Sequence, residues 1–446
     1  MTSSAVAAPA RAKFTVVGGG LGGALMAIFL GRSGYEVEVY EKRRDPRVGQ
    51  AEEGRSINLA ISARGLHALD QVGLASEILK RAIPMRGRMM HSLRGDLSLQ
   101  PYGTRENHVI NSVSRAELNM ALLNAAEKSP NVRIVFGKKC AGVDLETAAV
   151  TFLDDATGEA STASGDVVVA ADGAFSAVRH QMQKMERFDF EQSYLEHGYK
   201  ELSIPAGPNG TFLLERNALH IWPRGGYMMI ALPNHDGSFT CTCFWPLEGP
   251  NSFAALKSKA DVLRFFEERF PDAAPLMPTL AEDFFENPTG SLVTIRCRPW
   301  HVRDRVVLLG DACHAVVPFY GQGANAAFED CVVLNEALAR HAPDRERAFA
   351  FYQDSRKENA DALADLSLAN FVEMRDKTAS RAFLAGKRME KILHRLFPAW
   401  FVPLYTMVTF TRIPYAEAVA KAKRQLRFVW AGAAAVAVLV LLLVLL

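Results

Sequence analysis

The chain has few cysteines and no excess of charge of either sign. Its six cysteines, at positions 140, 241, 243, 297, 313 and 331, form no closely spaced framework, and the first residues do not read as a secretory signal. Both features disfavour a secreted, disulfide-stapled fold and favour a reduced compartment. The 51 basic residues nearly balance the 49 acidic ones, so the net charge of +2 gives no reason to expect a nucleic-acid partner.

Several catalytic patterns are also missing. No Ser-His-Asp set and no metal-ligating cluster stands at a convincing spacing, which disfavours triad hydrolysis and metal catalysis. No internal repeat or low-complexity tract occurs before the apolar end of the chain. With 446 residues, the chain is long enough for two or three domains, each with its own core.

A glycine-rich turn near the start of the chain lies between a strand pattern and a helix pattern. Gly18, Gly20 and Gly23 match G-x-G-x-x-G, in which the glycines permit a tight turn, close approach of a pyrophosphate and close helix packing. The next predicted strand ends at Glu41, at the spacing of an acid that binds a ribose. The sequence therefore predicts a dinucleotide site. A glycine-rich turn without a ligand and an ordinary strand-end acid are the alternatives.

A second turn carries an acid. Residues 306–309 predict a buried strand, Gly310 and Asp311 follow it, and residues 321–325 lead into a helix. A strand, an acid and a helix N-terminus make a natural anion site. Together with the first turn, this pattern indicates a bound flavin, FAD. We interpret His314 as packing near the flavin phosphate and not as a general base.

The order of predicted elements indicates an α/β domain combined with an antiparallel sheet. Residues 14–184 and 301–340 predict a discontinuous, Rossmann-like FAD-binding domain of the glutathione-reductase type. Residues 185–300 alternate between polar and apolar and predict a second, antiparallel β-sheet substrate domain. Residues 341–428 predict a helical C-terminal region, and residues 1–13 a flexible leader.

The last residues, 429–446, form an uncharged apolar run that just reaches the length needed to span a bilayer. Basic residues precede it: Lys421, Lys423, Arg424 and Arg427. Because basic flanks stay on the cytosolic side, the sequence predicts a membrane-associated protein with a C-terminal anchor and its catalytic body facing the cytosol, not a secreted one. A tail that lies on a membrane or inside a partner is the alternative. The oligomeric state is left open, a dimer included.

Three motifs in chain order, at 18–23, 172–173 and 310–311, resemble those of the single-component aromatic hydroxylases, which hold one FAD and use NAD(P)H. Within that group the chain resembles the kynurenine 3-monooxygenase family, from residue 14 to about 415. Seven stretches carry the narrower resemblance: 55–60, 84–91, 101–103, 112–115, 220–225, 318–323 and 370–375. A hydrophobic C-terminal tail is also familiar from membrane-bound members of the family.

The resemblance implies hydroxylation of L-kynurenine to 3-hydroxykynurenine with NADPH and O2, a step of tryptophan degradation. It implies that Arg88 pairs with the substrate carboxylate. The other implied substrate contacts are Tyr102, Asn370, Glu373, Met374 and Tyr405, with Phe319 and Tyr320 between flavin and substrate ring. The implied FAD contacts are Gly18, Gly20, Leu21, Gly23, Glu41, Arg43, Arg115, Asp311, Gly323, Ala324 and Asn325, where Ala324 replaces a methionine of the family.

From the residues alone, other interpretations stay open. Arg88 also fits a solvated arginine, and Tyr102 and Tyr405 equally fit core residues. Asn370 also fits a surface residue of a helix. A membrane-tethered epoxidase or flavin reductase is the nearest alternative function, although Arg88, Tyr102 and Asn370 together favour a small zwitterion. An escort protein for prenylated GTPases would have the glycine-rich fold without redox work, and the acids at 172 and 311 disfavour it. No second G-x-G-x-x-G locates an NADPH domain.

Overall fold

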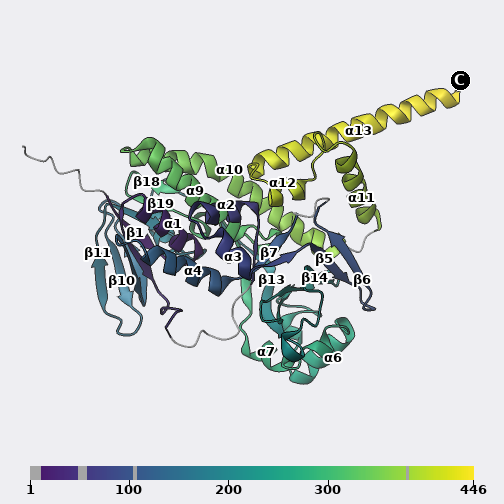
Figure 1. Cartoon of the computed structure of the whole chain (residues 1–446), viewed down its shortest axis with the longest axis horizontal. Coiled ribbons are helices and arrows are strands. Elements are labelled where there is room, and N and C mark those ends of the chain that lie inside the picture. Colours follow the sequence, from purple (N-terminus) through teal and green to yellow (C-terminus); the bar gives the residue numbers. More distant parts are fainter. Residues whose placement is uncertain (1–11, 49–57, 104–107, 378–380, 446) are drawn as a thin grey trace, which may run out of the picture.

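The computed structural model describes residues 12–48, 58–103, 108–377 and 381–445. Apart from its last two residues, the predicted leader lies outside these ranges. Figure 1 shows a first sheet with its helices on the left, a second sheet on the right, and one long helix that leaves the body at the upper right.

The first domain is built on a six-stranded sheet in the order β18-β19-β12-β1-β2-β8. All neighbouring pairs are parallel except β18 with β19. The strands are β1 (Lys13–Val17), β2 (Glu36–Glu41), β8 (Val132–Phe136), β12 (Val167–Ala170), β18 (His301–Val302) and β19 (Val306–Leu308). Strand β12 is buried along its whole length, as expected for a parallel sheet covered on both faces. Because β19 pairs with β12, a distant piece of chain completes this domain.

Helices α1 (Leu21–Arg32), α4 (Arg115–Glu127) and α9 (Gly323–His341) contribute to the same core as this sheet. Helix α4 begins where the side chain of Ser114 accepts a hydrogen bond from the amide of Glu117. The smaller elements around them are β3 (Asn58–Ile61), β4 (Ile83–Met85), β7 (Ile110–Ser114), β9 (Lys138–Val143), β10 (Val150–Asp154), β11 (Ala160–Ala163), α2 (Ala63–Gln71), α3 (Ala75–Arg81) and α5 (Ala177–Met182).

The second sheet has seven strands in the order β17-β13-β16-β15-β14-β5-β6. They are β5 (Gly87–His91), β6 (Leu97–Pro101), β13 (Asp189–Ile204), β14 (Ala218–Pro223), β15 (Met228–Pro233), β16 (Phe239–Pro246) and β17 (Gly290–Arg298), with helices α6 (Lys259–Arg269) and α7 (Leu280–Glu286) packed on this sheet. The sequence assigned residues 87–101 to the first domain. Their strands belong to the second sheet instead, because β5 pairs in parallel with β14.

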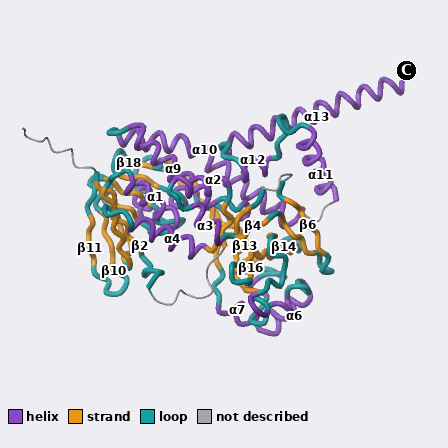
Figure 2. The backbone as a smooth tube through the Cα atoms, in the orientation of Figure 1, coloured by secondary structure: helices purple, strands orange, loops and turns teal. Residues whose placement is uncertain are grey.

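The C-terminal part is helical, as the sequence predicted. It contains α10 (Arg345–Val372), a π-helical turn at Glu373–Lys377, α11 (Arg381–Leu396), α12 (Leu404–Phe410) and α13 (Tyr415–Leu445). The short α8 (Asp311–His314) follows β19 and belongs to the first domain. Residues 429–445 of the predicted anchor form the outer part of α13, which projects away from the body (Figures 1 and 2). Over the described residues, no helix is both long enough and apolar enough to cross a membrane.

A buried charge network pins α8, α9 and α10 together. Nε2 of His314 lies 2.5 Å from Oδ2 of Asp330, and Nε of Arg356 donates to Oδ1 of the same carboxylate at 2.6 Å. Burial lowers the pKa of His314, but Asp330 raises it more, so the net shift is upward. His314 is therefore a structural partner of Asp330, and its Nε2 is engaged by that carboxylate.

The stability of the protein should fall as the pH rises above about 6.5, because the unfolded histidine loses its proton there while folded His314 keeps it. Below that pH both states bind the proton and the contribution is fully present. His314→Gln should lower stability at pH 6 by about 1–3 kcal/mol and flatten the fall above it. Thermal midpoints measured from pH 6 to 9 test this. The exposed His235→Gln is the control that should keep the slope, and an equal slope in His314→Gln would contradict the assignment.

Candidate active site

The three motifs of the sequence meet at one edge of the first sheet. Strand register places Val17 beside Ala170, and Ala170 beside Leu308. The turns at 18–23, 172–173 and 310–311 therefore begin side by side at the carboxyl ends of β1, β12 and β19. In open parallel sheets, ligands bind in the crevice outside these strand ends.

The helices that begin at this edge carry no side-chain cap. At the N-cap positions Gly20, Gly310 and Gln322, no described side chain accepts a hydrogen bond from the first turn of α1, α8 or α9. Uncapped first-turn N–H groups need acceptors, and the partial positive charge of a helix start favours anions. The crevice is thus suited to the phosphates and the polar ring edge of a flavin nucleotide.

The glycines of the first turn have different reasons to be glycine. Gly18 has a φ of +103°, and its amide donates to the carbonyl of Tyr40 at 2.8 Å. A Cβ at Gly23 would collide with the carbonyl of Gly18, so close packing requires glycine there. A Cβ at Gly20 would meet no protein atom within 4 Å. The space in front of Gly20 is open toward the crevice, which fits the close approach of a pyrophosphate, and Leu21 follows it as the buried first residue of α1.

Glu41 ends β2 beside this turn. Its carboxylate accepts hydrogen bonds from the amide of Gly19 at 2.8 Å and from Nε of Arg43 at 2.8 Å. Burial raises the pKa of Glu41, but Arg43 and the amide lower it more, so the net shift is downward and the carboxylate is ionised. A charged acceptor held in place at this strand end fits recognition of a ribose hydroxyl.

The other predicted FAD contacts surround the same edge. Arg115 is exposed at the start of α4, Asp311 is exposed at the start of α8, and Gly323 and Ala324 are half-buried in the first turn of α9. Asn325 differs, because its amide group is fully used inside the protein. Its Oδ1 accepts from the amides of Ser62 and Gly65, and its Nδ2 donates to the carbonyls of Ala60 and Gly321. Asn325 therefore shapes the flavin turn, and only its main chain is left for a ligand.

A separate cavity brings together most of the predicted substrate residues. Its wall includes Arg88, Tyr102, Tyr320, Asn370, Glu373 and Tyr405. They come from β5, the end of β6, the turn before α9, α10, the π-helical turn and α12. Residues far apart in the sequence thus share one cavity.

Arg88 lies against two aromatic rings in this cavity. Its guanidinium carbon is 5.0 Å from the ring centre of Tyr405 and 5.9 Å from that of Tyr102, and the two rings stack at 5.6 Å. Burial lowers the pKa of Arg88, but Tyr405, Tyr102 and Glu373 raise it more. Nε of Arg88 and Oη of Tyr102 are buried without a hydrogen-bond partner among the described residues. Such atoms call for a polar ligand, since leaving them unpaired is costly.

Phe319 and Met374 lie behind this wall and do not line the cavity. Nδ2 of Asn370 donates to the carbonyl of Phe319 at 2.6 Å and to Sδ of Met374 at 3.3 Å. Phe319 stacks on Phe371 with ring centres 4.3 Å apart. These contacts fix the position of Asn370 and form an apolar backing beneath the cavity.

The sequence missed the wall supplied by α11. Glu390, Lys391 and His394 line the cavity, and Nζ of Lys391 donates to the carbonyl of Pro101 at 3.2 Å. Nδ1 of His394 lies 2.7 Å from the carbonyl of Phe401. A helical pattern gives no signal that one face reaches a distant strand. Gln100 and Gly103 also line the cavity, and their place beside Tyr102 was the available hint.

The strand of Arg88 is fixed by two buried histidines, His91 and His220. Nε2 of His91 lies 2.8 Å from Nδ1 of His220, which joins β5 to β14, and Nδ1 of His91 lies 2.5 Å from Oδ2 of Asp272. Burial lowers the pKa of His220 to about 4, so it is neutral at ordinary pH. Both histidines therefore hold these strands together.

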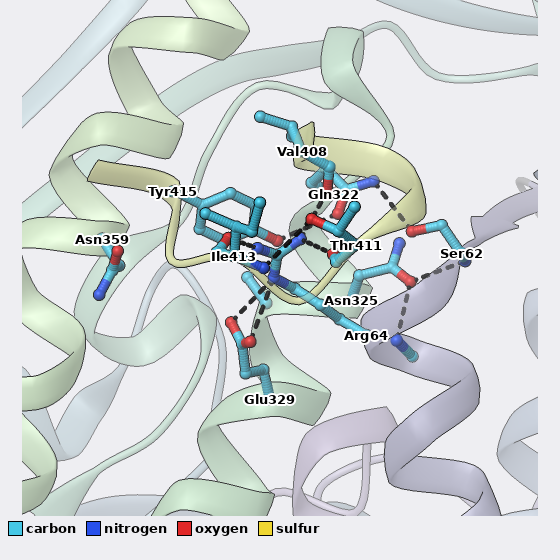
Figure 3. Close-up of polar contacts among 12 residues, drawn as sticks. Ser62, Arg64, Gln322, Asn325, Glu329, Asn359, Val408, Thr411, Ile413 and Tyr415 are labelled. Atoms are coloured by element: carbon cyan, nitrogen blue, oxygen red, sulfur yellow. Dashed lines mark hydrogen bonds and ion pairs between the residues drawn. The ribbon is translucent and has the colours of Figure 1, made fainter. Parts of the chain in front are cut away.

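A buried arginine connects the flavin turn with the segment that carries Tyr405 (Figure 3). From α2, the guanidinium of Arg64 donates to the carbonyls that end α12 and begin the link to α13. These carbonyls belong to Val408, Thr411 and Ile413. Arg64 also pairs with Glu329 of α9 at 3.1 Å, and its guanidinium carbon lies 3.9 Å from the ring centre of Tyr415.

Tyr415 extends this contact to the flavin turn. Its hydroxyl donates to Oε1 of Gln322 at 3.0 Å, and Nε2 of Gln322 donates to the hydroxyl of Ser62 at 3.1 Å. Gln322 stands just before the first turn of α9, next to Gly323. We call the set Arg64, Glu329, Gln322 and Tyr415 the Arg64 clamp. No pattern in the sequence predicted this clamp, because Arg64 has the pattern of a polar residue in an ordinary helix.

Comparison with known proteins agrees with this geometry. A family profile described as "FAD binding domain" matches residues 11–367. Kynurenine 3-monooxygenase of Myxococcus xanthus is 53% identical over 404 residues, which cover 91% of this chain and 87% of that one. The enzyme of the same name from Salinispora arenicola is 51% identical over 420 residues, covering 94% and 92%. The solved structure of 2-methyl-3-hydroxypyridine-5-carboxylic acid oxygenase has a similar fold, with a TM-score of 0.67 at 22% identity over 84% of this chain and 95% of that one.

The fold and the crevice define the class of protein as an FAD-binding monooxygenase. Within that class the identity and coverage of the relatives decide the narrower group. The chain belongs to the kynurenine 3-monooxygenase family, which confirms the resemblance seen in the sequence.

Gly20→Ala should separate folding from cofactor binding. The added methyl group meets no protein atom, so stability without FAD should change by less than about 1 kcal/mol, whereas FAD affinity should fall at least tenfold because the methyl group occupies the crevice. Flavin fluorescence titration and thermal midpoints measure the two effects. Gly22→Ala is the matched control, since its methyl group would make ordinary 3.9 Å contacts to Ala327 and Leu309 and should leave FAD binding intact. Unchanged FAD affinity in Gly20→Ala would place the pyrophosphate elsewhere.

Arg64→Met should loosen the segment that carries Tyr405. Removing the guanidinium takes away the hydrogen-bond donor of three carbonyls. We expect a loss of about 3–5 kcal/mol of stability. Backbone hydrogen exchange over residues 404–415 should rise, which mass spectrometry can measure in the full chain. Tyr415→Phe loses one hydrogen bond and should cost about 1 kcal/mol. Equal exchange in Arg64→Met and the unsubstituted chain would remove the clamp from the account of this site.

Proposed function

We propose that the protein hydroxylates L-kynurenine to 3-hydroxykynurenine with NADPH and O2, a step in tryptophan degradation. The name shared by relatives at about half identity supports this reaction. The single structural observation that carries the substrate class is Arg88, which lines a cavity near the flavin turn and whose buried Nε has no partner among the described residues. A guanidinium so placed matches a carboxylate.

The cavity offers charges of both signs. Arg88 would bind the carboxylate of an amino-acid substrate, and the carboxylate of Glu373 on the same wall complements its ammonium group. The stacked rings of Tyr102 and Tyr405 lie beside this guanidinium and line the same cavity. This pattern supports a zwitterion over the apolar substrate expected for an epoxidase.

FAD, once reduced by NADPH, supplies the oxygen-transfer chemistry in such enzymes. The chain's own contribution is to hold the substrate ring in place and to keep water out. Tyr320 lies at the wall between the flavin turn and the cavity, and Phe319 backs it. An apolar wall limits the entry of water, which otherwise diverts reduced flavin and oxygen to hydrogen peroxide.

The direct test is NADPH oxidation by the FAD-loaded protein with and without L-kynurenine, with product and peroxide assayed together. Stimulated oxidation with 3-hydroxykynurenine supports the proposal. Stimulated oxidation that yields only peroxide would make kynurenine an effector and not the substrate. Absence of any stimulation would favour the alternative of another flavin monooxygenase or a flavin reductase.

We also propose that the outer part of α13 attaches the protein to a membrane, with the catalytic body on the cytosolic side. The support is the uncharged sequence of residues 429–446 together with exposed side chains along it. Val438, Leu442, Leu443 and Leu445 are each more than half exposed. Lys423, Arg424 and Arg427 lie exposed just before this run, as a cytosolic flank requires.

Arg88→Ala should raise the KM for kynurenine about 10-fold to 150-fold, the range expected when a charge-assisted hydrogen bond of about 1.5–3 kcal/mol is lost. FAD should stay bound, because Arg88 lies in the second sheet and not in the crevice. Steady-state kinetics and the flavin spectrum measure both. Arg86→Ala, an exposed arginine two residues away, is the control and should keep the KM. A KM in Arg88→Ala equal to that of the unsubstituted enzyme would remove Arg88 from the site.

A further inference from the structure

Helix α11 exposes an apolar stripe although it belongs to the folded body. Met389, Ile392 and Leu396 are 57%, 58% and 63% exposed, and their spacing of three and four residues puts them on one face. Phe397 and Trp400 continue the stripe beyond the helix, at 54% and 47%. Scattered exposed apolar residues are normal, but three on one face of an amphipathic helix, with two more just beyond its end, indicate a contact surface.

The opposite face of α11 fixes the direction of this stripe. Lys391 and His394 line the substrate cavity and bond to the carbonyls of Pro101 and Phe401. The helix therefore stands between the cavity and the outside, and its apolar stripe points away from the cavity. Within the described part of the chain, the stripe residues keep about half or more of their surface exposed.

The stripe ends where the apolar run of α13 begins. Nε2 of Gln425 donates to the carbonyl of Trp400 at 2.9 Å, and the rings of Trp400 and Phe428 lie 6.2 Å apart. Phe428 and Trp430 are 63% and 72% exposed. Figure 1 shows α11 running steeply across the direction of α13 from near the middle of that helix, on the side where α13 leaves the body. A membrane or partner surface that receives α13 at this point would therefore extend along α11.

The charges beside the stripe are positive. Arg388 and Arg395 are exposed on α11, each one position before a residue of the stripe. Lys423, Arg424 and Arg427 are exposed on α13 near the junction. Basic residues beside an apolar face with tryptophan and phenylalanine at its edge are typical of helices that lie in a membrane interface. Tryptophan in particular prefers the headgroup level.

We propose that α11, with Phe397 and Trp400, docks in the interface of a membrane that contains anionic lipids, parallel to its plane, while α13 enters it. This inference deepens the proposed membrane attachment and rests on it. We name the five residues Met389, Ile392, Leu396, Phe397 and Trp400 the lipid-facing stripe. Because α11 is also a wall of the substrate cavity, the bilayer would support that wall, and the cavity would lie directly beneath the membrane surface.

A lipid surface fits better than a second copy of the chain. The stripe continues into the apolar end of α13, and a protein partner would have to cover both surfaces, which leave the body in different directions (Figure 1). The exposed arginines and lysines around the stripe would repel the same cations of another copy. Anionic headgroups match them.

Quenching by lipid-borne nitroxides in the full chain tests this placement. A fluorophore on Ile392→Cys, in a Cys140→Ser background that leaves only buried native cysteines, is compared with the same fluorophore on Leu263→Cys, an exposed position on α6. The protein is added to vesicles of phosphatidylcholine and phosphatidylglycerol that carry nitroxide on the acyl chains. We expect quenching several-fold stronger at position 392 than at position 263.

Each other outcome overturns the inference in a distinguishable way. Protein that floats with the vesicles but shows equal quenching at 392 and 263 would mean that α13 attaches and α11 does not dock. Protein that does not float would refute the attachment by α13 as well. Shielding of position 392 that grows with protein concentration without vesicles would assign the stripe to a second copy.

A pair of substitutions gives an independent measurement. The double change Ile392→Ser and Leu396→Ser in the full chain should weaken partitioning into the anionic vesicles about tenfold, as expected when two large apolar side chains no longer leave water. Leu263→Ser should leave partitioning unchanged. Equal partitioning of the double variant and Leu263→Ser, with both variants folded normally, would overturn the inference.

Discussion

The guanidinium of Arg64 binds parts of the chain that lie between 265 and 349 positions further along the sequence. Its N–H donors serve Glu329 of α9 and three carbonyls at the end of α12 and in the link to α13, while the ring of Tyr415 covers its face. An arginine can do this because its planar fork presents several fixed donors at once, which a lysine cannot. The flavin turn and the tyrosine-bearing segment of the cavity are positioned by this one side chain.

The two ligand sites are built on different principles. The flavin crevice uses main-chain groups at the carboxyl edge of a parallel sheet, where glycines give access and helix starts give N–H donors. The substrate cavity uses side chains from strands, a π-helical turn and several helices. Arg88 reaches it only because β5 pairs with β14 and is tied to it through His91 and His220. The first site is local in the sequence, and the second exists only after the two domains and the helical region have assembled.

The C-terminal region joins catalysis to its surroundings. Helix α12 contributes Tyr405 to the cavity, the link after it is held by Arg64, and α13 carries the chain outward. Helix α11 closes the cavity on another side and shows its apolar stripe to the outside. Events at the outer surface therefore have a short physical path to the substrate, through helices that have one face in the cavity and another exposed.

Local patterns account for the part of this protein that could be predicted. Gly18, Gly20 and Gly23 predict their turn because backbone geometry or close approach within a few residues requires each of them. The strand–turn–helix order around Asp311 is equally local. The predicted substrate residues were found by resemblance and not by physics. Six of them share the cavity, while Phe319 and Met374 lie behind its wall. Their individual roles remain predictions.

The sequence by itself determined the α/β nucleotide domain, the mainly antiparallel second sheet, the helical C-terminal part and the class of cofactor, because strand and helix periodicity and glycine spacing act over short distances. The parallel pairing of β5 with β14 in the second sheet was not predicted. Only the tertiary structure decided that residues 87–101 join the second sheet and that α11 lines the cavity. It also decided that the side-chain amide of Asn325 bonds to the protein's own main chain. It also decided that Arg64, which looks ordinary in its helix, is buried. These features depend on pairings between distant segments, and a pairing leaves no periodic trace in either segment alone.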